Sequence, residues 1–115
     1  EGAHWNMATW IQMRALDMVR VSTAKGGYTG AIKVAHLAES FGMRAQVHGY
    51  DPHLCAGIVN NDYAEILVIN TEQIKELKND PQHPVIDGYV TTSDEPGLGQ
   101  HPDWDELEKR AVLVV

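Results

Sequence analysis

Residues 17–47 carry the pattern that most restricts the fold of this chain. Two short apolar runs, Asp17–Val21 (DMVRV) and Met43–Val47 (MRAQV), read as strands. Between them, the apolar positions of Tyr28–Phe41 recur at spacings of three and four residues, which is typical of a helix with one buried face: Ala31, Val34, Ala35, Ala38 and Phe41. Gly26-Gly27 precedes this helix and Gly42 follows it, where a left-handed residue commonly ends a helix. The pattern predicts a parallel strand–helix–strand unit.

The remainder of the chain extends this alternation. Helices are predicted over Met7–Leu16, His53–Val59 and Asp103–Arg110, a strand over Tyr63–Ile69, and a hairpin-like or extended segment over Pro84–Thr92. The fold class is therefore α/β, with about three βα units. A closed parallel barrel needs roughly eight strands, so the chain forms either a small open sheet or part of a larger structure.

Composition narrows the classes of function. The 115 residues carry a net charge of −7, and the nine basic residues form no stripe, which argues against nucleic-acid binding. No apolar run is long enough to span a bilayer. A single cysteine, Cys55, cannot form an internal disulfide and fits a reducing, cytoplasmic compartment. The chain begins with Glu1 rather than Met, so we expect residues upstream of it.

Chemically useful side chains are expected at the carboxyl ends of the predicted strands, where α/β proteins place their sites. His48 ends the second strand, and its ordinary pKa of about 6.5 suits a general base. Gly49 after it leaves room for a substrate, and Ser22, which follows the first strand, is a second candidate for substrate binding. Glu65 is an acid within an apolar strand, where a carboxylate needs a partner. A histidine held only by backbone groups, and a glutamate facing solvent, are the structural alternatives.

Three segments, taken in order, resemble a known family. KGGYTGAIKVAHLAESFGMRAQVHG, then HLCAGIVNNDYAEILVI, then DGYVTTSDEPGLG are similar to the C-terminal third of the enolase superfamily. The similarity is greatest to the subgroup of mandelate racemase and muconate lactonizing enzyme, which includes sugar-acid dehydratases and cycloisomerases. The resemblance implies that residues 1–115 form the C-terminal part of a (β/α)7β TIM-like barrel, about three βα units and a C-terminal tail, without the capping domain and earlier strands.

The resemblance also implies roles for individual residues. His48 takes the position of the general base that removes the proton alpha to a carboxylate. Glu65, about a dozen residues after His53-Leu54, takes the position of a glutamate that lies near the substrate carboxylate and stabilises the enolate. Glu1 is the one candidate ligand for the Mg²⁺ ion that the family uses. The implied substrate is a small-molecule carboxylate, a sugar acid.

One departure from the family pattern leaves alternatives open. The aspartate that usually orients the histidine is replaced here by Val21 or Ser22. This difference favours a variant such as a cycloisomerase, or a His48 that acts mainly as an acid. The isolated chain is alternatively a catalytically incomplete fragment or a small non-catalytic α/β module. Its uncovered apolar faces predict association, most simply as a homo-oligomer.

Overall fold

The computed structural model describes residues 4–67, 70–72, 75, 85–99 and 101–112. Its central unit is a pair of strands, β1 (Met18–Val21) and β2 (Arg44–Val47), connected by the helix α2 (Thr23–Ser40). The strands run parallel, with Met18 opposite Arg44 and Val21 opposite Val47. The predicted parallel strand–helix–strand unit is therefore confirmed.

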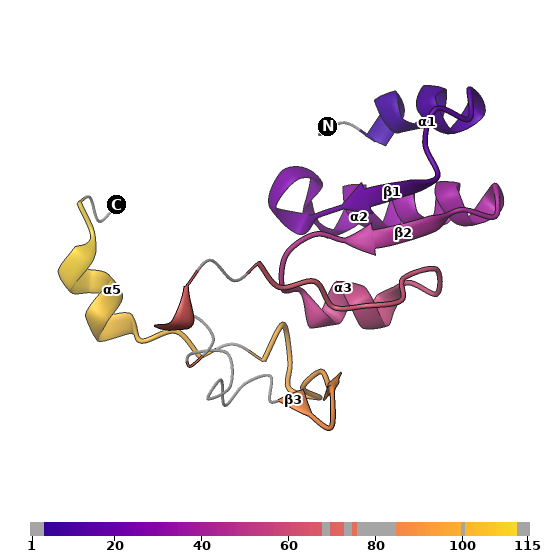
Figure 1. The fold of residues 1–115 in the computed structure, drawn as a ribbon. Coiled ribbons are helices and arrows are strands. Elements are labelled where there is room, and N and C mark those ends of the chain that lie inside the picture. The colour runs from indigo at the N-terminus through magenta and orange to yellow at the C-terminus, as the bar shows by residue number, and fades with distance from the viewer. Residues whose placement is uncertain (1–3, 68–69, 73–74, 76–84, 100, 113–115) are drawn as a thin grey trace.

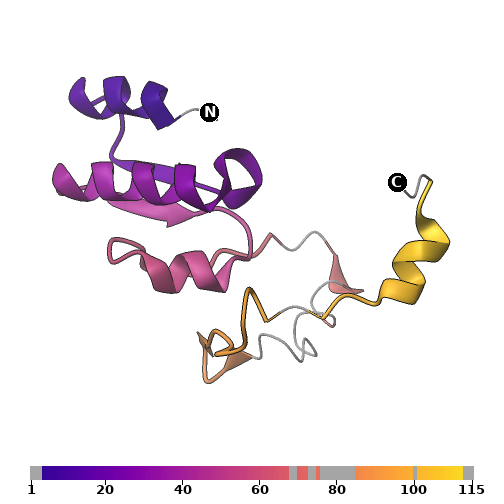
Figure 2. The same ribbon diagram turned by 180° about the vertical axis from the view of Figure 1, so that it is seen from behind.

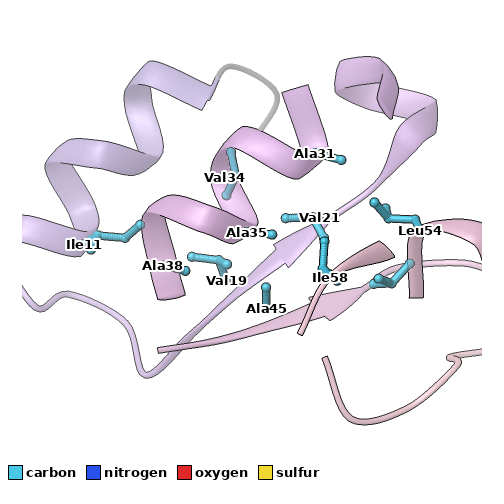
Figure 3. Close-up of a cluster of buried hydrophobic side chains, with 11 residues drawn as sticks. Ile11, Val19, Val21, Ala31, Val34, Ala35, Ala38, Ala45, Leu54 and Ile58 are labelled. Atoms are coloured by element: carbon cyan, nitrogen blue, oxygen red, sulfur yellow. The ribbon is translucent and has the colours of Figure 1, made fainter. Parts of the chain in front are cut away.

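Helix α2 covers one face of the two strands, as the two opposite views in Figures 1 and 2 show. Helices α1 (His4–Gln12) and α3 (Pro52–Gly57) lie on either side of it. The buried side chains of these elements form one hydrophobic core (Figure 3), which contains Ile11, Val19, Val21, Ala31, Val34, Ala35, Ala38, Ala45, Val47, Leu54 and Ile58. Small alanines on α2 allow the helix to approach the strands closely.

Alternation along the strands separates their two faces. Val19 and Val21 are buried toward α2, whereas Arg20 between them is exposed on the opposite face. The same alternation in β2 buries Ala45 and Val47. Because side chains of a strand alternate with a period of two, His48, next after Val47, continues on the face of Arg20.

Glycines set both ends of the long helix. Gly27 has a φ of 63° and breaks α2 between a first turn and the main helix, which agrees with the break predicted at Gly26-Gly27. At the other end Gly42 has a φ of 69°. Its N–H donates to the carbonyl of Glu39, and the Met43 N–H donates to that of Ala38, at 2.9 Å each. This is the Schellman arrangement expected at a helix end with a left-handed glycine.

Three helix predictions need correction, of which one concerns only the bounds: the helix predicted over His53–Val59 spans Pro52–Gly57. Phe41, predicted on the buried face of α2, is 52% exposed, because it caps the helix and lies beyond the last buried turn. The first helix was predicted over Met7–Leu16 but spans His4–Gln12. Arg14 adopts a left-handed φ of 51°, and the Ala15 N–H closes the helix by donating to the carbonyl of Trp10 at 3.0 Å.

The third predicted strand, Tyr63–Ile69, is wrong over residues 63–67, and Val68 and Ile69 lie outside the described residues. The hydrogen bonds at the edge of β2 that faces away from β1 explain the difference. The Ala45 N–H donates to the backbone carbonyl of Asn60, but the Val47 N–H donates to the side chain of Asn61, at 3.1 Å. A side chain therefore takes the place that a neighbouring strand would fill, and the ladder stops.

The C-terminal predictions are confirmed where the structure describes them. Strands β3 (Val85–Ile86) and β4 (Tyr89–Val90) form an antiparallel hairpin whose turn residues, Asp87 and Gly88, both have positive φ. This is the Asp-Gly turn that short hairpins favour. Helix α5 (Trp104–Arg110) begins after Asp103, whose carboxylate accepts the Glu106 N–H at 3.0 Å. No helix among the described residues is long and apolar enough to cross a membrane.

Candidate active site

The candidate site lies at the carboxyl ends of β1 and β2, on the face that α2 leaves uncovered. His48 follows β2 directly, and its backbone N–H donates to the carbonyl of Val21 at 2.8 Å. This bond continues the parallel ladder by one residue, so the backbone of His48 is fixed by the sheet. Its side chain is 44% exposed.

Glu65 reaches the same place although it does not lie on a strand. Its Oε1 is 3.1 Å from Nδ1 of His48. The preceding segment is held to β2 by Gln46, whose side-chain amide donates to the carbonyl of Tyr63 at 3.0 Å. The structure therefore brings together the two residues that the sequence selected as catalytic candidates.

Arg20 is the third member of the cluster. Its guanidinium Nη2 lies 2.5 Å from Nδ1 of His48 and forms an ion pair with Glu65. Sequence reasoning did not select Arg20. The available signal was a charged residue inside the short apolar strand MVRV, one residue before its end. With parallel strands in this register, such a residue shares the face of His48.

The cluster controls the charge of Glu65. The hydrogen bond with His48, and then the bond and positive charge of Arg20, hold the pKa of the Glu65 carboxyl below its ordinary value. Glu65 is therefore ionised at neutral pH and can only accept hydrogen bonds.

Gly49 and Ser22 occupy the loops that follow the two strand ends. Gly49 has a φ of 87°, and a Cβ built on it would meet nothing within 4 Å. Backbone conformation therefore accounts for glycine at this position. Ser22 is the residue before α2, and its carbonyl accepts the N–H groups of Lys25 and Gly26. Neither Val21 nor Ser22 provides a carboxylate at the end of β1.

Asp51, in the loop after β2, connects that loop to α2 and α3. Its carboxylate accepts the hydroxyl of Thr23 at 2.8 Å, the hydroxyl of Tyr28 at 2.9 Å and the N–H of Leu54 at 3.0 Å. The last bond caps α3. Burial, together with the hydrogen bond to Asp51 and its negative charge, raises the pKa of Tyr28 to about 12. The loop after β2 is thus fixed to the N-terminal part of α2.

Neither Cys55 nor a metal cluster adds chemistry to the described site. Burial raises the pKa of the Cys55 thiol, which disfavours a reactive thiolate. Within the described ranges, no three His, Cys, Asp or Glu side chains gather in a way that could hold a metal ion. Glu1, the predicted Mg²⁺ ligand, lies outside the described residues.

Comparisons with known proteins agree on one family. Residues 2–106 match the family model described as enolase C-terminal domain-like. A D-galactonate dehydratase family member from Enterocloster bolteae is 30% identical over 118 aligned residues, which cover 90% of this chain and 29% of that protein. A second member, from Oceanicola granulosus, is 33% identical over 115 aligned residues, covering 90% of this chain and 28% of that protein.

A solved structure shows the same likeness in three dimensions. The crystal structure of D-glucarate dehydratase from Agrobacterium tumefaciens, complexed with magnesium, matches with a TM-score of 0.78 and 33% identity. The match covers 94% of this chain and 30% of that one. The chain thus spans less than a third of the length of the relatives it matches. The family model, the relatives and the solved structure together show that the chain belongs to the enolase superfamily and to the family described as enolase C-terminal domain-like.

Proposed function

We propose that the chain is the C-terminal part of the (β/α)7β barrel of a Mg²⁺-dependent sugar-acid dehydratase. The observation that carries the proposal is the convergence of His48 and Glu65 at the strand ends of a chain whose relatives are named as dehydratases of sugar acids. The length of those relatives supports the assignment to part of a larger barrel. The rest of that barrel, or a second copy of the protein, would cover exposed apolar side chains such as Trp10 and Met18, and a homo-oligomer belongs to the same proposal.

His48 is the proposed general base. The proton alpha to a carboxylate is very weakly acidic, so its removal needs a base held in position. When the Nε2 atom of His48 accepts that proton, the ring becomes an imidazolium. The ionised carboxylate of Glu65 stabilises this cation by accepting the hydrogen of Nδ1. This role fits the lowered pKa of Glu65 better than donation of a hydrogen bond to an enolate, because the ionised group has no hydrogen to donate.

The proposed reaction is an elimination. His48 removes the α proton, the bond between the β carbon and its hydroxyl oxygen breaks, and the His48 imidazolium returns a proton to that oxygen, so that water leaves, the histidine is regenerated and an enol remains. The enol then tautomerises to an α-keto acid. Mg²⁺ would stabilise the negative charge that develops on the substrate carboxylate. The described residues do not form its site, so no step above depends on a ligand in this part of the chain.

Dehydration is favoured over racemisation by the relatives, which are named as dehydratases of sugar acids. Both reactions begin with removal of the α proton, and a base at His48 would benefit from a dedicated aspartate that orients the ring. Val21 and Ser22 offer none, and Glu65 is instead shared with Arg20. The arrangement supports proton transfer at one nitrogen without supplying the usual dyad.

The test uses the full-length protein that contains this chain. It is incubated with a panel of aldonic and aldaric acids in the presence of Mg²⁺, and α-keto acid is detected as its semicarbazone. We expect turnover of at least one sugar acid, its loss with excess EDTA, and its loss in His48→Asn. The matched control is His36→Asn, which changes an exposed histidine on α2. Absence of keto acid with every sugar acid would refute the proposal.

A further inference from the structure

We propose that Arg20 is a positioning residue that determines which ring nitrogen of His48 carries the hydrogen. The inference rests on the proposed function only in that His48 is the group facing the substrate. It starts from the crowding around one atom. Nδ1 of His48 lies 2.5 Å from Nη2 of Arg20 and 3.1 Å from Oε1 of Glu65.

The chemistry of these neighbours decides the tautomer. Arginine has only donors and keeps its proton in proteins, so Nδ1 is the acceptor when it is hydrogen-bonded to Nη2, which is the nearer of its two neighbours. In this hydrogen-bonded state Nδ1 carries a lone pair, and in the neutral ring the hydrogen is on Nε2. The two hydrogens of Nη2 then serve two acceptors, Nδ1 of His48 and the carboxylate of Glu65.

Without Arg20 the preference reverses. Glu65 accepts hydrogen bonds only, so it pairs with Nδ1 when that nitrogen carries the hydrogen. In this tautomer Nε2 offers the lone pair that a general base needs. Arg20 and Glu65 thus compete for opposite states of the same atom. Proton abstraction at Nε2 requires the Arg20 bond to Nδ1 to give way to a hydrogen bond from Nδ1 to Glu65.

This competition gives Arg20 a role that packing does not explain. Its side chain is 50% exposed, and it projects from the strand face opposite the core. Its contacts there are polar and are made to the two candidate catalytic side chains. The end of β1 has no aspartate. Arg20, on the same strand, contacts the Nδ1 atom of the His48 ring as a donor rather than as an acceptor.

The test reads the tautomer directly by long-range ¹H–¹⁵N NMR of the imidazole. It uses the ¹⁵N-labelled full-length protein that contains this chain, at a pH of about 8, where an ordinary histidine is neutral. His48 is assigned by the loss of its signals in His48→Asn. In the parent chain we expect Nε2 to be the protonated nitrogen. In Arg20→Met we expect the hydrogen to move to Nδ1, so that the two nitrogens exchange their characteristic shifts.

Two further variants separate positioning from a structural effect. Arg20→Lys keeps a donor and is expected to restore part of the Nε2-protonated form. Arg44→Met removes the same charge from the neighbouring strand, where Arg44 is paired with Asp62, and is expected to leave the tautomer unchanged. Backbone amide spectra confirm that each variant is folded.

Protonated Nδ1 in the parent chain, or an unchanged tautomer in folded Arg20→Met, would overturn the inference. These measurements need no substrate or metal. Failure of the dehydratase assay alone therefore refutes the proposed function and leaves the result for Arg20 standing.

Discussion

Replacement of Asn60 tests how the loop after α3 is held to the core. Asn60 is 6% exposed, and its side-chain Nδ2 donates to the carbonyls of Ala35 on α2 and Met43 before β2, each at 3.0 Å. Each such bond contributes about 0.5–1.5 kcal/mol net, so Asn60→Ala is expected to lower the free energy of unfolding by about 1–3 kcal/mol. Urea denaturation followed by far-UV circular dichroism measures the change.

Asn60→Asp keeps the size of the side chain but replaces its hydrogen-bond donor, Nδ2, with a second acceptor oxygen. At pH 7 it places a buried carboxylate against two carbonyl oxygens, so it should destabilise more than Asn60→Ala. Burial beside acceptors raises the folded-state pKa of this carboxyl, so the lost stability should return as the pH falls toward about 4, the ordinary pKa of aspartate. Asn61→Ala, which removes the acceptor of the Val47 N–H, should cost about 1 kcal/mol. Equal stability of the Ala and Asp variants at pH 7 would refute the reasoning.

Three further predictions follow from the described contacts. The folded-state pKa of Glu65 is lowered, so its stabilising contribution is present above the unfolded pKa of about 4.3 and is lost in acid. The urea midpoint of Glu65→Gln should therefore lie below that of the parent at pH 7 and converge with it at low pH. The pKa of Tyr28 is raised to about 12, so stability should fall as the pH rises from 10 toward 12, and phenolate absorbance with Tyr28→Phe as reference would show whether Tyr28 is responsible. Ala38 is fully buried, so Ala38→Leu should cost roughly 1–3 kcal/mol, whereas Phe41→Leu on the exposed cap should change stability by no more than about 0.5 kcal/mol; equal effects in urea denaturation would contradict the packing described.

The strand–helix–strand unit could be predicted because its signals are local. Apolar spacing over residues 28–41 identifies the buried face of α2, and Gly42 marks its end by a backbone requirement that other residues meet poorly. The predicted strand at Tyr63–Ile69 had an equally good local pattern. It is absent over residues 63–67 because a strand needs a partner edge, and the side chain of Asn61 occupies the edge of β2. The sequence pattern of one segment does not reveal whether a partner edge is available to it.

The site was predictable in the same partial way. His48 could be selected because it follows an apolar run, and parallel strand ends share one edge of a sheet. Glu65 was selected as an acid within an apolar run, but the strand predicted there is absent over residues 63–67, and Glu65 reaches His48 from a segment without regular structure. Arg20 was missed because a single arginine in an exposed alternating position usually needs no explanation. Its meaning depends on the register between β1 and β2, which places it beside His48. That register comes from packing, which the sequence of β1 alone does not specify.

The central claim is that His48 removes the proton alpha to the carboxylate of a sugar acid. Its most direct measurement is the exchange of that proton for deuterium in D₂O, followed by ¹H NMR, in the full-length protein with Mg²⁺. The account predicts that His48→Asn lowers the exchange rate by about 10²–10⁴-fold, the usual contribution of a general base, while His36→Asn leaves it unchanged. Exchange at the parent rate in a folded His48→Asn variant would contradict the account and assign proton removal to a different residue.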